Sequence, residues 1–298
     1  SCPLRMKTDM TAEEYKNKID AALEKCFVLT GDFPQAKLAE AMRYSLLAGG
    51  KRIRPMLVLE FCRISGGDVD QALPVACAIE MLHTYSLIHD DLPCMDDDEL
   101  RRGRPTNHMV YGECTAVLAG DTLQAEAFGT ILRSQLPADR RAECAEILAG
   151  AAGIDGMCAG QYLDMSWEGR SLTEQELTEI NSRKTGALIV AACQMGVAAA
   201  GGSRLMMDSA GHFGAALGMA FQIRDDMLDV LSTDEELGKP VGSDARECKN
   251  TYMVLMGKEG CEKIINKLTE FAKDILKEAF EDTGFLSNLA DSLACRNK

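Results

Sequence analysis

Residues 90–99 have the sequence DDLPCMDDDE, so six of ten consecutive positions carry a carboxylate. The preceding residues 81–89 are largely apolar, which predicts that the acids lie at the end of a buried helix. Two like charges 4 Å apart repel by about 1 kcal/mol in water and about 4 kcal/mol at an effective dielectric constant of roughly 20. A divalent cation would relieve that repulsion, and carboxylates without clustered Cys or His suit Mg²⁺ or Mn²⁺ better than zinc. A solvated acidic turn is the alternative.

A second acidic cluster, QIRDDMLD at residues 222–229, ends another apolar run, AALGMAF at residues 215–221. Asp225 and Asp229 are four residues apart, about 40° on a helical wheel, so they share one face. An amphipathic helix that reaches solvent would show the same pattern. Two such clusters, each at the end of an apolar run, favour a clamp for Mg²⁺ ions and a diphosphate.

The first cluster cannot lie on one regular helix if its acids share an ion. Asp90 and Asp96 are six residues apart, about 120° around an ideal helix, and Pro93 lies between them. The helix must therefore bulge or end there. His83 lies seven residues before Asp90, about 20° away on the wheel, which places it on the same face two turns deeper. A His that only completes the core is the alternative for this position.

Cationic side chains accompany the acids. They lie in GGKRIRP at residues 49–55, RRGR at 101–104, KTG at 184–186 and at Lys239. Arg presents a planar fork that binds phosphate with two hydrogen bonds, and Lys is a point donor. Charge balance with the neighbouring acids is the alternative for residues 101–104. The Gly pair does not belong to a P-loop, because the spacing of that motif is absent.

Helices must position these motifs. Thr11 and Glu14 fit a capping box, and no stretch shows a convincing strand pattern or a fixed repeat. We see no interdomain linker and expect one all-α domain over residues 1–298. The helical patterns cover residues 11–28, 36–48, 74–91, 116–136, 139–165, 173–200, 205–231 and 257–280, with one more helix starting near Pro55.

The overall charge excludes some classes of function. Lys and Arg total 32 and Asp and Glu total 46, so the formal net charge is −14. Such acidity disfavours binding to nucleic acid or to an anionic membrane. Residues 185–203 form a 19-residue stretch without charge, but Gln194 and four glycines within it favour a buried helix over a membrane span.

The 12 cysteines include no Cys-x-x-Cys pair, which argues against a structural zinc site. A chain of 298 residues needs no disulfides to form a core, and no secretory segment is apparent. We therefore expect reduced, mostly buried thiols in a cytoplasmic protein. Cys94, inside the first acidic cluster, is the thiol that we expect to be most sensitive to oxidation.

In this order and spacing the motifs resemble those of the trans-prenyl diphosphate synthases, most of all the farnesyl diphosphate synthases of the bacterial type. The resemblance runs from about Tyr44 to the final residues and rests on SLIHDDLPCMDDDELRRGRPTNH, GGKRIRP, KTGAL and FQIRDDMLDV. It implies an all-α homodimer, each chain a single large helical bundle around a deep central cavity. The implied reaction condenses isopentenyl diphosphate with dimethylallyl or geranyl diphosphate by ionisation, condensation and proton loss. Three Mg²⁺ ions, or Mn²⁺, would bridge the two acidic motifs and the allylic diphosphate.

The resemblance also implies roles for single residues. The metal ligands would be Asp90, Asp96 and Asp225, while Asp91 and Asp229 belong to the motifs without an assigned contact. The isopentenyl diphosphate site would contain Lys51, Arg54, His83 and Arg102. The allylic diphosphate and its reaction would involve Arg101, Lys184, Thr185, Gln222 and Lys239. Residues 232–250, which hold Lys239, would form a lid that excludes water.

Product length is tied in the bacterial type to an aromatic residue five positions before the first Asp, here Tyr85, as a floor under a C15 chain. Helix geometry instead places Ser86 nearer the Asp90 face, about 40° away against about 140° for Tyr85. A C20 geranylgeranyl diphosphate synthase is therefore the first alternative. A class I terpene cyclase or a non-catalytic protein of the same fold is disfavoured by the second Asp-Asp-x-x-Asp motif and by the intact cationic motifs.

Overall fold

The computed structural model describes residues 10–237 and 250–295. Contacts group the chain into two compact units, the first up to Leu59 and over Leu73–Ser134, the second over Glu60–Ala72 and from Gln135 onward. The predicted all-α fold is confirmed: in the described residues, the strands are confined to one two-stranded antiparallel hairpin. The single domain over residues 1–298 stays a prediction.

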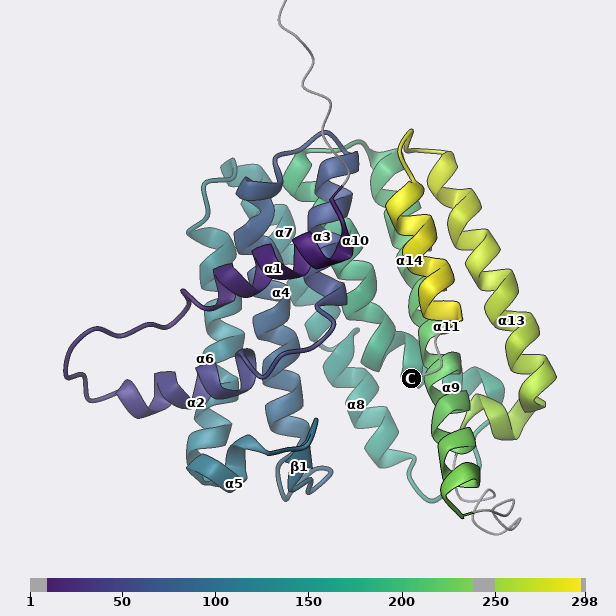
Figure 1. The fold of residues 1–298 in the computed structure, drawn as a ribbon, viewed down its shortest axis with the longest axis horizontal. Helices are drawn as coiled ribbons and strands as arrows, with labels where there is room; N and C mark the ends of the chain where they lie inside the picture. Colours follow the sequence, from purple (N-terminus) through teal and green to yellow (C-terminus); the bar gives the residue numbers. More distant parts are fainter. Residues whose placement is uncertain (1–9, 238–249, 296–298) are drawn as a thin grey trace, which may run out of the picture. The chain divides into compact units, whose positions relative to one another are not determined.

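The first unit carries the first acidic cluster and the basic loop of residues 49–54 (Figure 1). Its elements are α1 (Ala12–Leu23), α2 (Ala36–Leu46), the start of α3 (Ile53–Ile64), most of α4 (Val69–Asp90), β1 (Leu100–Arg101), β2 (Arg104–Pro105), α5 (Asn107–Tyr111) and α6 (Glu113–Leu132).

The second unit carries the KTG motif and the second acidic cluster. Within it α11 runs beside α10 and α13 (Figure 1). Its elements are α7 (Ala138–Ala152), α8 (Met157–Ser166), α9 (Glu174–Asn181), the π-helical turn η1 (Ser182–Gly186), α10 (Ala187–Ala200), α11 (Arg204–Leu237), α13 (Tyr252–Lys277) and α14 (Gly284–Ala294).

Local sequence signals explain where several helices begin and end. The predicted capping box opens α1, with the Glu14 N–H donating to Thr11 Oγ1 and the Thr11 N–H donating to Glu14 Oε2. A second box, at Thr173 and Glu176, opens α9. α1 ends at Leu23, before the predicted residue 28, because the chain turns there and Phe27 adopts a left-handed φ of 57°.

Other helix predictions were wrong in their bounds. Residues 139–165 form two helices, and the break lies at Gly153–Gly156. A Cβ at Gly156 would lie 2.0 Å from the Ala151 carbonyl oxygen, so the chain turns more tightly there than other residues allow. Residues 173–200 are divided by η1, and α14 was missed.

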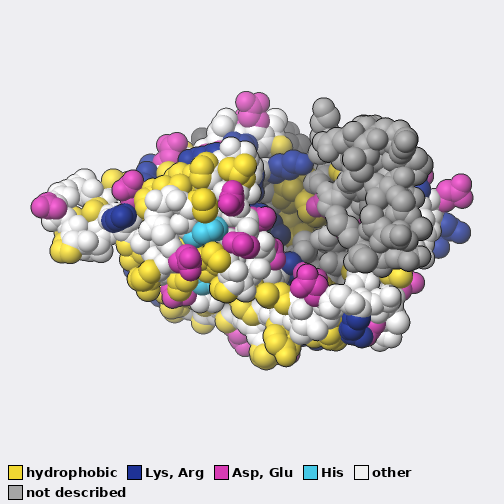
Figure 2. Space-filling view, turned by 90° about the horizontal axis from the view of Figure 1, so that it is seen from below, with side chains coloured by type: hydrophobic (Ala, Val, Ile, Leu, Met, Phe, Trp, Pro, Cys, Tyr) yellow, Lys and Arg dark blue, Asp and Glu magenta, His cyan; other side chains and the backbone are white. Residues whose placement is uncertain are grey.

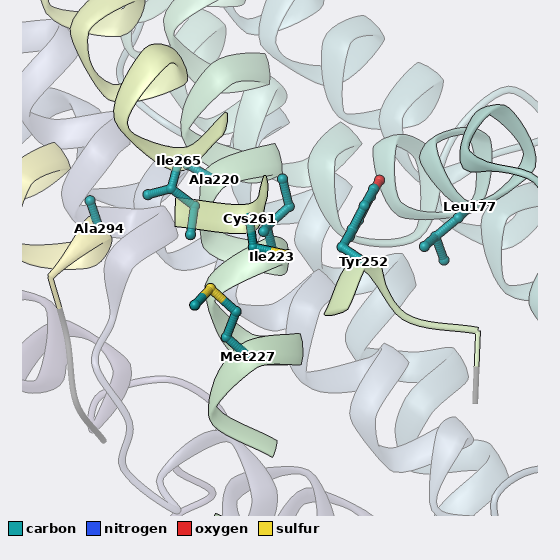
Figure 3. Close-up of a cluster of buried hydrophobic side chains, with 8 residues drawn as sticks. All are labelled: Leu177, Ala220, Ile223, Met227, Tyr252, Cys261, Ile265 and Ala294. Atoms are coloured by element: carbon teal, nitrogen blue, oxygen red, sulfur yellow. The ribbon is translucent and has the colours of Figure 1, made fainter. Parts of the chain in front are cut away.

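A hydrophobic cluster in the second unit fixes the orientation of α11 (Figure 3). From α11 it takes Ala220, Ile223 and Met227, which follow the three- and four-residue spacing of one helix face. Asp225 therefore lies on the other side of α11. The partners come from α9, α13 and α14, namely Leu177, Tyr252, Cys261, Ile265 and Ala294.

The uncharged stretch of residues 185–203 contains all of α10, whose side chains are largely buried as the sequence predicts. Among the described residues, no helix is both long and apolar enough to cross a membrane.

A substitution at Gly160 in α8 tests how closely η1 must approach that helix. A Cβ at this position would lie 2.2 Å from the Lys184 backbone nitrogen and 2.7 Å from its Cα, so one backbone must move. We expect Gly160→Ala to destabilise the protein by about 1–3 kcal/mol, which lowers Tm by several degrees. In the control Gly150→Ala, nothing lies within 4 Å of the new Cβ, and we expect Tm to stay or rise slightly. Equal Tm values for both variants would contradict the prediction.

Candidate active site

The first acidic cluster is built at the C-terminal end of α4. The helix ends at Asp90, and the chain then folds back so that the Asp96 N–H donates to the Asp90 carbonyl at 2.9 Å. Asp97 closes the turn with a left-handed φ of 54°. The ending required by the spacing of Asp90 and Asp96 is therefore present, and Asp96 is exposed while Asp90 is half-buried.

Asp91 has a different environment from its neighbours. It is 3% exposed, and its Oδ1 accepts hydrogen bonds from Arg101 Nε at 2.7 Å and Nη2 at 2.6 Å. Burial raises the pKa of Asp91, while the Arg101 guanidinium opposes that shift. Asp91 thus holds Arg101, which the sequence assigned to the allylic diphosphate.

The β1–β2 hairpin carries the neighbouring cation towards the basic loop. Arg102 and Gly103 form its turn with φ values of 53° and 73°. The Arg102 guanidinium donates to the Gly49 carbonyl, and a Cβ at Gly50 would lie 2.7 Å from Arg102 Nη1. The structure thus brings together Arg102 and the loop of Lys51, as the predicted isopentenyl diphosphate site requires.

Two residues that sequence reasoning missed hold this region. Arg52, inside the basic loop, is buried and donates to Asp20 Oδ1 at 2.9 Å and to Glu80 Oε1 at 2.6 Å. Asn107, after the hairpin, donates to the Ala41 carbonyl, at 2.8 Å. Sequence spacing gives no signal for these contacts, because their partners lie 28 to 66 residues away.

Arg54 and His83 form a hydrogen-bonded pair. Arg54 Nη1 lies 3.3 Å from His83 Nε2, and because Arg only donates, Nε2 is the acceptor. Burial and then the charges of Arg54 and Arg102 hold the pKa of His83 well below its ordinary value, so its ring is neutral. Arg54 Nε is buried and has no hydrogen-bond partner among the described residues, so it lacks the acceptor that a buried donor usually has.

Lys184 and Thr185 lie in η1, the π-helical turn between α9 and α10. Such turns are rare and concentrate at functional sites. Lys184 Nζ forms an ion pair with Asp164 Oδ2 at 2.7 Å, and Asp164 is another residue that the sequence did not reveal.

A chain of hydrogen bonds joins η1 to α11. Thr185 Oγ1 donates to Gln222 Oε1 at 3.2 Å, and Gln222 Nε2 donates to Asp226 Oδ1 at 3.0 Å. The buried Asp226 accepts in turn from the Tyr252 backbone N–H at 3.0 Å. Asp226 therefore fixes the side chain of Gln222. Asp225, the other described carboxylate of this cluster, lies on the side of α11 opposite the hydrophobic cluster.

Three of the sequence predictions lie beyond what the structure describes. Lys239 and most of the predicted lid at residues 232–250 fall outside the described residues, as does the side chain of Asp229.

The two candidates for control of chain length differ in their surroundings. Tyr85 is 7% exposed, and its ring meets the His89 ring edge-to-face with centroids 5.3 Å apart. Ser86 is half-buried, and its Oγ donates to the His83 carbonyl at 2.7 Å. Tyr85 is therefore buried against His89, while the smaller side chain of Ser86 lies on the side of α4 that carries Asp90.

No three His, Cys, Asp or Glu side chains gather into a metal-binding group in the part of the chain that the structure describes. Within the first cluster, Asp96, Asp97, Asp98 and Glu99 are exposed, and Figure 2 shows acidic groups, in magenta, on the face seen from below. Their all-oxygen donor set still fits a hard cation, provided that a phosphate and water supply further ligands.

Comparisons with known proteins show the family of this chain. Residues 35–288 match the family model described as polyprenyl synthetase. The chain belongs to the polyprenyl synthetase family. It is an enzyme that transfers and elongates prenyl chains, as the sequence motifs predict.

Individual relatives carry two kinds of name. A farnesyl diphosphate synthase of Geobacillus stearothermophilus is 44% identical over 296 residues, covering 98% of this chain and 99% of that enzyme. A chloroplastic geranylgeranyl pyrophosphate synthase of Capsicum annuum is 45% identical over 263 residues, covering 87% and 71%. The crystal structure of an FPP/GFPP synthase from Zymomonas mobilis superposes with a TM-score of 0.85 at 33% identity, covering 95% and 97%.

The neutral His83 of this polyprenyl synthetase predicts a pH dependence of stability. Below about pH 6.5, the pKa of an ordinary His, the unfolded chain binds a proton that the folded protein does not. The contribution of His83 to the free energy of unfolding should therefore fall by about 1.4 kcal/mol per pH unit as the pH drops further. Urea unfolding of wild type and His83→Gln between about pH 7 and 5 measures this, and we expect a shallower loss in the variant. Parallel curves would contradict a neutral His83.

Proposed function

We propose that this polyprenyl synthetase condenses isopentenyl diphosphate with dimethylallyl and geranyl diphosphate and releases farnesyl diphosphate. The observation that supports a C15 product is the buried ring of Tyr85, five residues before Asp90. The C20 product geranylgeranyl diphosphate is the second candidate, because the small Ser86 lies nearer the Asp90 face of α4 than Tyr85 does. A homodimer and a cytoplasmic location belong to the same proposal.

Isopentenyl diphosphate would be bound by Lys51, Arg54, His83 and Arg102. The contacts of Arg102 with the basic loop and of Arg54 with His83 support this grouping. A diphosphate oxygen would accept from the unpartnered Arg54 Nε, and the neutral His83 adds no further positive charge to be balanced. These residues would hold the diphosphate and leave the double bond free to attack.

The allylic diphosphate would be bound by Arg101, Lys184 and Lys239. Arg101 and Lys184 are held by Asp91 and Asp164, so they are already ordered before a substrate arrives. Thr185 and Gln222, joined by their hydrogen bond, would direct oxygen atoms towards the positive charge that develops on the allyl group. The lid proposed for residues 232–250 would exclude water from that charge.

We propose Asp90, Asp96 and Asp225 as the ligands of Mg²⁺, with three ions expected from the family and Mn²⁺ as a substitute. The metal supplies Lewis-acid stabilisation of the charge on the departing diphosphate. The protein contributes the carboxylates, and the turn after α4 places Asp96 at the end of the helix that carries Asp90.

The metal assignment predicts the effect of removing the carboxylates. The double variant Asp90→Ala, Asp225→Ala should lose at least about a thousandfold in kcat, since metal stabilisation contributes several kcal/mol and each 1.4 kcal/mol is about tenfold. Activity of the wild type should disappear with a chelator and return with Mg²⁺. Asp97→Asn is a matched control, because it removes a charge from the same cluster and Asn tolerates the left-handed φ of Asp97. Retained turnover in the double variant would refute the metal site.

The product length is tested at Tyr85. Tyr85→Ala should shift the products from C15 towards C20 and longer, because the chain could then extend past the position of the ring. Product chromatography with Mg²⁺ and both five-carbon substrates measures the shift. Ser86→Phe places a large side chain on the Asp90 side of α4 and tests whether that side limits the chain length. If Tyr85→Ala still gives C15 while Ser86→Phe shortens the product, the floor function belongs to the Ser86 side.

A further inference from the structure

The hydrogen bonds that join η1 to α11 have a direction, and Asp226 sets it. Both carboxylate oxygens of Asp226 accept, Oδ1 from Gln222 Nε2 at 3.0 Å and Oδ2 from the Tyr252 backbone N–H at 3.0 Å. Gln222 and Asp226 are four residues apart on α11 and therefore share one of its faces. Asp226 is 8% exposed, so both contacts are largely shielded from water.

The donor from Tyr252 is fixed, because it belongs to the backbone. Tyr252 is the first residue of α13 and follows the N-cap Thr251, so its N–H has no acceptor within the helix. Its ring is buried in the hydrophobic cluster with Leu177 and Ile223 (Figure 3). The start of α13 is thus held in place, and the side chain at position 226 must keep an oxygen towards it.

The carboxylate of Asp226 leaves the Gln222 amide one favourable orientation. An amide has an acceptor on one side and a donor on the other, whereas a carboxylate oxygen accepts. The Gln222 NH₂ group must therefore face Asp226, and its carbonyl oxygen then faces Thr185, whose hydroxyl donates to it at 3.2 Å. Because its proton is used in this bond, the Thr185 oxygen presents only lone pairs in other directions.

The same direction decides the sign of the electrostatic potential beside η1. If the Gln222 amide were reversed, its NH₂ group would donate to Thr185 Oγ1, and the Thr185 hydroxyl would turn its proton elsewhere. Both side chains would then direct hydrogen atoms, and not oxygen atoms, towards their surroundings. Dipoles that are fixed in the favourable direction before a reaction stabilise the charge of the transition state, and dipoles fixed in the reverse direction oppose it.

We propose that Asp226 is a positioning residue for prenyl transfer, which acts by fixing the direction of the Gln222 amide and, through it, of the Thr185 hydroxyl. This inference rests on the function proposed above, in which these two side chains face the positive charge that develops on the allyl group. In this role Asp226 needs no contact of its own with substrate or metal. Its two oxygen atoms connect the start of α13 to Gln222 and hold both dipoles with their oxygen atoms towards that charge.

Asp226→Asn tests this direction with almost no change of shape. The oxygen of the new amide must stay on the Tyr252 N–H, because a buried donor without an acceptor is costly. The new NH₂ group then faces Gln222, whose amide must reverse to accept from it. Steady-state kinetics with Mg²⁺, dimethylallyl diphosphate and isopentenyl diphosphate should show kcat lowered about a hundredfold, as for the loss of one preorganised dipole, and unchanged KM values.

Thr178→Val is the matched control for a purely structural effect. It removes the hydrogen bond between Thr178 Oγ1 and the Tyr252 hydroxyl, at 3.2 Å, and leaves the Tyr252 N–H on Asp226. It thus weakens the same buried region without reversing either dipole. We expect a lower Tm with kcat and KM as in the wild type.

The double variant Asp226→Asn, Gln222→Glu restores the direction with the same total charge. The carboxylate at position 222 can accept from the new NH₂ group with one oxygen and from the Thr185 hydroxyl with the other. Gln222→Glu alone instead places two carboxylates against each other. We expect kcat of the double variant to exceed that of either single variant by at least about tenfold, a coupling of the size found between residues in contact.

Two results would overturn the inference. One is a wild-type kcat in Asp226→Asn. The other is a double variant no more active than Gln222→Glu, which decides the question even if Asp226→Asn fails to fold. A wild type that does not condense the two five-carbon substrates would overturn the proposed function itself, and this inference with it.

Discussion

The buried guanidinium of Arg52 is the contact on which the basic part of the site depends. A charge in this position is stable only with carboxylates beside it, and Asp20 and Glu80 supply them from two different helices. Removing one partner of such a buried pair commonly costs about 3–5 kcal/mol. Arg52 also adopts a left-handed φ of 53°, which the ion pairs must stabilise. The ion pairs of Arg52 thus fix the segment that carries the neighbouring Lys51 and Arg54.

At the end of α4, the acidic side chains likewise depend on groups that compensate their charge. Carboxylates close to one another repel unless something compensates each charge. Asp90, Asp91 and Asp96 have different surroundings in this turn. Asp91 points into the protein and meets Arg101, while Asp96 returns to the helix end through a backbone hydrogen bond and stays exposed. Consecutive residues in a helix terminus point in different directions, so Asp91 can be buried against Arg101 while Asp96 stays at the surface.

The fold class could be predicted from the sequence, because it follows from local patterns. Capping at Thr11, the ending of the helix at Asp90 and the buried character of α10 need only neighbouring residues. The partners of Arg52, Lys184 and Gln222 could not be predicted, since they depend on which distant segments the fold brings together. The π-helical turn η1 was also hidden, because an inserted residue in a helix changes the hydrogen bonding without changing the composition.

The cations of the site fall into two electrostatic classes, and the difference bears on how anionic substrates bind. Arg101 and Lys184 each already contact a carboxylate, so a diphosphate can bind them only by sharing or replacing Asp91 and Asp164. Part of the gain in such an exchange is offset by the contact that is lost. Arg54 has instead a buried Nε without a hydrogen-bond partner among the described residues, and it feels the negative charge of Glu80 and then the positive charge of Arg102. In the proposed site, an anion at Arg54 Nε would take up a hydrogen bond that no described residue makes and would offset the repulsion from Arg102, so fewer contacts would be exchanged there than at Arg101 or Lys184.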